Sequence, residues 1–288
     1  MSWRGDSAAL ACFTFDVDAE SPILAESALY ARNAGLMSHQ AYGPLVGVPR
    51  LIQLLADYSL PATFFVPGWT ADRYPQTVDA ILTAGHEVAH HSYAHYSPFA
   101  QTEDEERADF ERALESLRGL GAEVEGFRCP SWEPAWRTPQ IVAEHGLLYD
   151  SSLMDSDTPY MLDTGAGELA ELPVHWSLDD WEQYAYMPDP PFRSPIESPA
   201  KVLDLWTSEL DAMRRYGCLF VLTCHPFLSG RPYRVEVLRA LIEHALAAGD
   251  VEFASCRDVA RRVRDDASVE RKVLTPVMVE PGLYPDGG

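Results

Sequence analysis

Residues 8–18 are Ala8-Ala9-Leu10-Ala11-Cys12-Phe13-Thr14-Phe15-Asp16-Val17-Asp18. The part before Asp16 is almost entirely apolar, and a short run of this kind predicts a buried strand. Asp16 and Asp18 follow at once, and side chains two residues apart on a strand point the same way. Two ionised carboxylates this close repel each other unless a cation or a proton lies between them. The strand therefore ends in a cation site or simply enters a polar loop, since Asp is common at such ends.

The composition limits the classes of partner. The chain has 288 residues, of which 47% are hydrophobic, and its 44 acidic and 22 basic residues give a net charge of −22. A surface this acidic argues against nucleic acid and membranes as partners. The five cysteines are scattered without a CxxC pair, so reduced thiols are expected. No apolar run approaches the roughly 18 residues of a membrane span, and the apolar run after Arg4 is too short for a signal peptide. We therefore expect a cytoplasmic protein.

Strand and helix signals alternate along the chain, which predicts an α/β fold with a mainly parallel sheet or barrel. Helices are expected over about 48–58, 74–84, 103–119, 139–145, 199–215 and 233–248. Strands are expected over about 62–66, 87–89, 124–130, 147–149, 169–175 and 218–224, with another starting at Val251. Residues 19–47, 182–198 and the tail from about 274 to 288 are expected to be irregular. No linker divides the chain, so residues 1–288 are expected to form one domain with its core at about 8–265.

Four histidines lie within residues 85–95, which are Gly85-His86-Glu87-Val88-Ala89-His90-His91-Ser92-Tyr93-Ala94-His95. His86 and His90 form an HExxH pattern, which binds zinc when a helix places both histidines on one face. The glycine before this pattern ends the predicted helix. His91 and His95 offer a second pair, which Asp18 would complete to three ligands with an open position, as in catalytic zinc sites. Hydrogen-bonded structural roles remain a third possibility.

Polar residues follow several of the predicted strands. Ligands of α/β sheets and barrels bind at the carboxyl ends of the strands. We therefore expect these side chains to meet at one rim: Asp16, Asp18, His91, His95, Arg128 and His225.

These motifs resemble those of the NodB-homology polysaccharide deacetylases, carbohydrate esterase family 4. Residues 14–18 are similar to the family's TFDD motif with one residue inserted, and residues 91–95 fit its HSxxH motif. Arg128-Cys129-Pro130 resembles the RxP motif, Asp180-Trp181 the Asp-Trp motif, and Leu222-Thr223-Cys224-His225 the last motif. The resemblance spans about residues 10–260. It implies a distorted (β/α)₇ barrel.

The resemblance also implies a role for each site residue. Asp18, His91 and His95 would hold one divalent metal ion, expected to be zinc, although cobalt, nickel or manganese would also suit these ligands. The other implied roles are Asp16 as general base, Arg128 as the partner that keeps it ionised, His225 as general acid, and Asp180, or alternatively Asp179, as the group that fixes the His225 tautomer. The expected substrate-binding residues are Pro130, Trp132, Trp176 and Trp181.

Each implied role has a plainer alternative in the sequence. Arg128 could form an ordinary surface salt bridge, which contributes little. His225 could be a strand-end histidine bonded to a nearby carbonyl. The tryptophans could be core residues.

Several further segments resemble a cytoplasmic branch of the family, which includes cyclic imide hydrolases and allantoinase-like members. They are Asp16-Val17-Asp18-Ala19-Glu20, Gly47-Val48-Pro49-Arg50, Glu171-Leu172-Pro173 and Trp176-Ser177-Leu178-Asp179-Asp180. This resemblance implies a homo-oligomer, a dimer or tetramer, that hydrolyses the C–N bond of a small amide or cyclic imide. The alternatives are N-deacetylation of peptidoglycan or chito-oligosaccharides, and a non-catalytic carbohydrate- or ligand-binding protein with the same fold.

Overall fold

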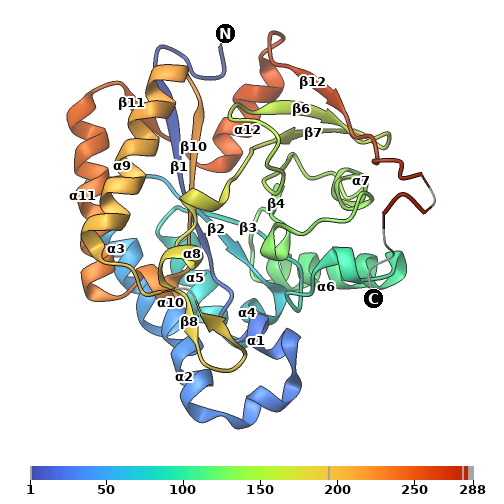
Figure 1. Cartoon of the computed structure of the whole chain (residues 1–288), viewed down its shortest axis with the longest axis vertical. Coiled ribbons are helices and arrows are strands. Elements are labelled where there is room, and N and C mark those ends of the chain that lie inside the picture. The colour runs from blue at the N-terminus through green and yellow to red at the C-terminus, as the bar shows by residue number, and fades with distance from the viewer. Residues whose placement is uncertain (1, 194, 281, 285–288) are drawn as a thin grey trace.

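The computed structural model describes residues 2–193, 195–280 and 282–284. Within these residues, ten strands form one sheet in the order β10-β1-β2-β3-β4-β5-β7-β6-β12, and β11 also pairs with β1 (Figure 1). The strands are β1 (Ala9–Asp16), β2 (Thr63–Val66), β3 (Glu87–His90), β4 (Gly126–Phe127), β5 (Tyr149–Asp150), β6 (Tyr160–Asp163), β7 (Glu168–Glu171), β10 (Leu219–Cys224), β11 (Val251–Phe253) and β12 (Arg271–Val273). A separate hairpin consists of β8 (Tyr186–Met187) and β9 (Phe192–Arg193).

Helices surround the sheet (Figure 1). The α-helices are α1 (Ser21–Glu26), α2 (Ala34–Tyr42), α3 (Val48–Tyr58), α4 (Gly68–Arg73), α5 (Pro75–Thr83), α6 (Glu103–Gly119), α7 (Thr138–Glu144), α8 (Trp181–Tyr184), α9 (Pro199–Tyr216), α10 (Pro226–Ser229), α11 (Pro232–Ala248) and α12 (Cys256–Asp265). Shorter or irregular turns are η1 (Ala28–Arg32), η2 (Gly43–Gly47), η3 (Pro98–Ala100), η4 (Pro130–Trp132) and η5 (Trp176–Leu178).

The parallel strands form an incomplete barrel, which confirms the predicted fold class. Neighbours are parallel from β10 through β1, β2, β3, β4 and β5 to β7. On the remaining side, an isolated parallel bridge pairs Asp179 with Thr223, and the Asp180 amide donates to the Thr223 carbonyl at 3.0 Å. The chain after β7 is thereby linked back to β10.

Strand β1 lies at the centre of this arrangement and is buried along its whole length. Its odd-numbered aromatics, Phe13 and Phe15, pack into the core between sheet and helices. Leu10 and Cys12 belong to a second core, together with residues of several other strands and of α12. Because strand side chains alternate, Thr14 and Asp16 point to the same side as Leu10 and Cys12. Asp16, the last residue of β1, therefore points to the side of the sheet that holds this second core.

The expectation of an irregular segment over residues 19–47 is wrong, because α1, η1, α2 and η2 fill it. Its turn-forming residues act as helix-start signals instead. Pro22 occupies the first turn of α1, Ser27 accepts from the Leu29 amide at the start of η1, and Asn33 accepts from the Leu36 amide at the start of α2.

The expectation for residues 182–198 is wrong in part, because α8 and the β8–β9 hairpin lie there, although residue 194 is outside the described part. Strands β6 and β12 and helix α12 were not expected from the sequence. Helix α12 begins with Ser255, whose side chain accepts from the Asp258 amide. The predicted capping box of Thr102 and Glu105 is confirmed at the start of α6.

Across the described residues, no helix combines the length and the apolar character that a membrane crossing needs. All five cysteines are buried and free.

Candidate active site

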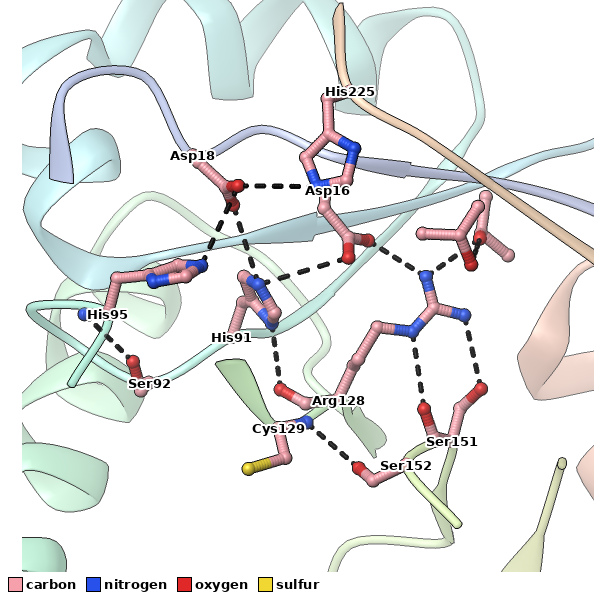
Figure 2. Close-up of polar contacts among 12 residues, drawn as sticks. Asp16, Asp18, His91, Ser92, His95, Arg128, Cys129, Ser151, Ser152 and His225 are labelled. Carbon is pink, nitrogen blue, oxygen red and sulfur yellow. Dashed lines mark hydrogen bonds and ion pairs between the residues drawn. The ribbon is translucent and has the colours of Figure 1, made fainter. Parts of the chain in front are cut away.

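Six of the predicted side chains meet at one edge of the sheet, where the parallel strands end (Figure 2). Strands β1, β3, β4 and β10 deliver them at or just after their last residues. The six are Asp16, Asp18, His91, His95, Arg128 and His225. The expected rim is therefore present in the structure.

Asp18, His91 and His95 form a compact group. The Asp18 carboxylate lies 3.4 Å from His91 Nε2 through Oδ1 and 3.6 Å from His95 Nε2 through Oδ2. One potential ligand atom from each residue lies within 4.8 Å of the others. His91 Nδ1 contacts the Arg128 carbonyl at 2.8 Å, so this nitrogen carries the proton and Nε2 is left free to act as a ligand.

Burial sets the protonation of this group. Burial lowers the pKa of His91 to about 3 and the pKa of His95 well below its ordinary value, so both rings are neutral, as metal ligands must be. Burial also raises the pKa of Asp18 to about 7, and Asp18 Oδ1 has no hydrogen-bond partner among the described residues. A buried carboxylate without a partner is costly. A divalent ion between this oxygen and two imidazoles would satisfy it, so the residues fit zinc or a similar metal.

The HExxH alternative does not fit the structure. His90 ends β3 and His86 directly precedes that strand, so the pattern lies on an extended chain rather than on a helix. His90 uses both ring nitrogens internally, with Nε2 at 2.9 Å from the Phe110 carbonyl and Nδ1 accepting from the Ser92 amide at 3.1 Å. His90 is therefore a structural residue.

Asp16 is held by a buried arginine. Arg128 Nη1 donates to Asp16 Oδ1 and to Thr14 Oγ1, each at 2.8 Å. Its other nitrogens donate to Ser151, Nε to the carbonyl at 3.3 Å and Nη2 to Oγ at 3.1 Å. Arg128 has no exposed surface, so the alternative of a surface salt bridge is wrong. Asp16 Oδ2 is left facing His91 Nε2 at 3.9 Å.

Two buried acids, Asp150 and Glu171, accept hydrogen bonds from Ser151 and the two residues that follow it. Asp150 and Glu171 are paired residues of β5 and β7, and both side chains are fully buried. Asp150 Oδ1 accepts from the Ser151 amide and the Ser152 hydroxyl, and Glu171 Oε1 accepts from the amides of Ser152 and Leu153. The backbone that holds Arg128 is thereby fixed.

Thr14, Ser151 and this acid pair were not assigned a role in the site from the sequence. The available signals were that Thr14 opens the TFDD-like motif, that Glu171 opens the segment Glu171-Leu172-Pro173, and that Asp150 and Ser151 follow a predicted strand.

His225 is oriented by Asp180 rather than by Asp179. Its Nδ1 lies 2.7 Å from Asp180 Oδ1 but 3.6 Å from Asp179 Oδ1. Asp180 also accepts from the His225 amide and from the Ser229 hydroxyl, so this carboxylate is saturated with donors. Burial alone lowers the pKa of His225, but the hydrogen bond to Asp180 and the charges of Asp179, Asp180 and Asp18 outweigh burial and raise that pKa well above 6.5. A carbonyl-bonded histidine, the simpler expectation, is not what the structure contains.

A cavity of about 460 Å³ opens above these groups. Trp132, Trp176 and Trp181 line it as expected, and the Trp132 and Trp176 rings lie 4.8 Å apart. Pro130 is not among the described lining residues, because it is buried at the start of η4. Its neighbour Ser131 takes a positive φ of 54° and lines the cavity instead.

Other lining residues were not among the expected substrate-binding residues. They are Pro22, Ala25, Glu26, Tyr96, Ser97, Glu133, Asp179 and Glu182.

Comparisons with known proteins agree on one family. The family model described as polysaccharide deacetylase matches residues 42–149. The chain is 30% identical over 242 residues to the peptidoglycan deacetylase of Helicobacter pylori, covering 75% of this chain and 83% of that protein. It is 49% identical to a putative polysaccharide deacetylase from Mycobacterium smegmatis, whose crystal structure superposes with a TM-score of 0.93 and coverages of 97% and 98%. An allantoinase structure has the same fold, with 23% identity, a TM-score of 0.80 and coverages of 93% and 94%.

Proposed function

Because the chain belongs to the polysaccharide deacetylase family, a family of amide-bond hydrolases, we propose that it is a metal-dependent hydrolase of a small amide or cyclic imide. One observation carries this proposal. Asp18, His91 and His95 line a single pocket together with Asp16, which Arg128 holds, and His225, which Asp180 holds.

Asp18, His91 and His95 would hold the metal, which supplies Lewis-acid chemistry and a lowered pKa for a bound water. Asp16 takes the proton of the attacking water through Oδ2, since Oδ1 is engaged by Arg128. His225 presents Nε2 to the pocket because Asp180 holds Nδ1, and it donates a proton to the nitrogen that leaves when the C–N bond breaks.

The size of the cavity supports a small substrate. Its volume of about 460 Å³ lies within the usual range for small-molecule pockets. Helix α1 supplies one wall through Pro22, Ala25 and Glu26, and α8 supplies another through Trp181 and Glu182. Such walls would limit the access of water around a bound substrate, which would strengthen electrostatic interactions with the reacting group.

A second candidate is N-deacetylation of an amino-sugar oligomer. The name of the Helicobacter pylori relative favours it, and tryptophan faces in the pocket would suit sugar rings. A purely binding role is a weaker candidate, because the proposed base, acid and metal ligands are all retained in one pocket.

The test measures kcat/KM of the zinc-loaded protein for succinimide- or hydantoin-type rings, for small acyclic N-acetyl amides and for N-acetylglucosamine oligomers. Faster turnover of the small amides supports the proposal. Faster turnover of the oligomers would replace it with the deacetylase candidate. Absence of turnover by a protein that holds its metal would reject a hydrolase altogether.

A further inference from the structure

The active-site cavity contains carboxylates that the proposed reaction does not use. They are Glu26 on α1, Glu133 just after η4, Asp179 before α8 and Glu182 on α8. They come from three segments, with Asp179 and Glu182 in the same one, and these segments meet only in the folded chain. Among the described lining residues there is neither lysine nor arginine.

The cavity therefore has an excess of negative charge even with its metal in place. A divalent ion together with Arg128 would balance Asp16, Asp18 and Asp180. His225, the proposed general acid, faces Asp179 at 3.6 Å, so the carboxylates of the described lining that have no cationic partner are Glu26, Glu133 and Glu182. Glu182 Oε2 is buried without a hydrogen-bond partner among the described residues, and Asp179 is only 5% exposed. Charges shielded from water act more strongly on a ligand than exposed ones.

Aromatic faces accompany these carboxylates. Tyr96 and three tryptophans line the same cavity, with the Trp132 and Trp176 rings 4.8 Å apart. Indole and phenol faces attract cations through their ring quadrupoles. Carboxylates combined with aromatic faces recognise an ammonium group, whereas a neutral imide ring would leave the carboxylates unused.

We propose that the preferred substrate is an N-acyl amine that also carries a free, protonated amine. This proposal rests on the amide hydrolysis proposed above and specifies its substrate class. Glu26, Glu133 and Glu182 attract the ammonium group, while the acyl group lies at the metal ligands. Water adds to the acyl carbon, the C–N bond breaks, and the products are a carboxylate and a diamine. Two classes of compound combine an N-acyl group with a free ammonium group: acyclic monoacylated diamines and partly deacetylated amino-sugar oligomers.

Two matched pairs of compounds test whether a positive charge on the substrate matters, and they distinguish acyclic diamines from amino sugars. The acyclic pair is monoacetylated 1,4-diaminobutane and the neutral N-pentylacetamide, which has the same chain length. The sugar pair is chitobiose with one acetyl group and chitobiose with two. We expect kcat/KM to be at least about tenfold higher for the charged member of one pair, and this preference to shrink in high salt. The pair that shows the preference identifies the substrate class, acyclic diamine or amino sugar.

The variant for this test combines Glu26→Gln, Glu133→Gln and Glu182→Gln, none of which belongs to the proposed catalytic groups. The control combines Glu115→Gln, Glu123→Gln and Glu270→Gln, which removes the same charge from exposed positions outside the cavity. The pocket variant should lose the preference, because its kcat/KM for the charged compound falls toward its value for the neutral one. The control should retain the preference.

Calorimetric titration with 1,4-diaminobutane gives a readout that does not depend on hydrolysis. The metal-loaded parent and control proteins should bind it, and the pocket variant should bind it at least about tenfold more weakly. Equal kcat/KM within both pairs, or a preference that survives in the pocket variant, overturns the charge proposal and leaves amide hydrolysis intact. Diamine binding that is lost in the pocket variant, in a protein that hydrolyses no amide, supports charge recognition and rejects the hydrolase.

Discussion

At the scale of single residues, the site separates metal binding from proton transfer. Asp16 and Asp18 are two positions apart, yet only Asp16 is held by Arg128, and only Asp18 approaches both His91 and His95. The sequence predicted that both acids lie at one strand end. Their different partners could be assigned before the structure only through the family resemblance, because they depend on which strands are neighbours.

Replacing Asp16 by Asn tests the role of general base. Asn keeps the shape of the side chain and can still accept from Arg128, but it cannot take a proton from water. We expect kcat to fall by roughly 10²–10⁴ while the metal content stays at the parent level. Metal analysis and steady-state kinetics on the same sample check this. A metal-free variant would identify Asp16 as a ligand instead.

Replacing each of the two acids beside His225 by Asn should lower kcat by different amounts. Asp180→Asn removes the carboxylate 2.7 Å from His225 Nδ1, so the ring loses its fixed tautomer and kcat should fall roughly 10–100-fold. Asp179→Asn is the matched control at 3.6 Å, and its effect on kcat should be smaller. The difference should be larger for substrates with poor leaving groups, because these need the acid most. Equal losses in both variants would contradict the assignment of Asp180.

At the scale of elements, strand alternation predicted that Asp16 and Asp18 leave the strand end together, whereas the surroundings of the site were harder to predict. Residues 19–47 contain prolines, glycines and asparagine, which favour loops in isolation. In the structure Pro22 and Asn33 start helices, and α1 becomes a wall of the cavity. The support of Arg128 by Ser151 depends on the pairing of β4, β5 and β7, which a local pattern does not encode.

The acid pair between β5 and β7 should make stability depend on pH. Burial raises the pKa of Asp150 to about 6, and burial together with the charge of Asp150 raises the pKa of Glu171 well above its ordinary value. The folded chain thus binds more protons here than the unfolded chain, whose carboxyls titrate near pH 4. The stabilising effect is complete below about pH 4 and is lost as pH rises through about 6.

Glu171→Gln should reduce this pH dependence. The amide oxygen of Gln can still accept from the Ser152 and Leu153 amides, and the side chain cannot lose a proton. Between pH 5 and 7 the free energy of unfolding should decline by about 1–3 kcal/mol less than in the parent. Urea unfolding at several pH values measures this, with the exposed Glu123→Gln as control. Identical pH profiles for all three proteins would show that the pair does not hold the extra proton.

At the scale of the whole molecule, the barrel gathers groups that are far apart in the sequence. Residues from 16 to 225 converge because parallel strands present their carboxyl ends at one rim. This arrangement could be predicted, since each functional residue follows an apolar run. The acidic lining of the cavity could not, because a net charge of −22 does not indicate where the acids gather.

The most direct test of the central claim is the metal content of three purified proteins: the parent, His95→Ala and His86→Ala. The His86→Ala control removes a histidine of the same cluster that lies outside the proposed ligand set. Elemental analysis after dialysis should find about one divalent ion per chain in the parent and in His86→Ala, and almost none in His95→Ala, with hydrolytic activity following the metal. Full metal content in His95→Ala, or its loss in His86→Ala, would contradict a centre formed by Asp18, His91 and His95.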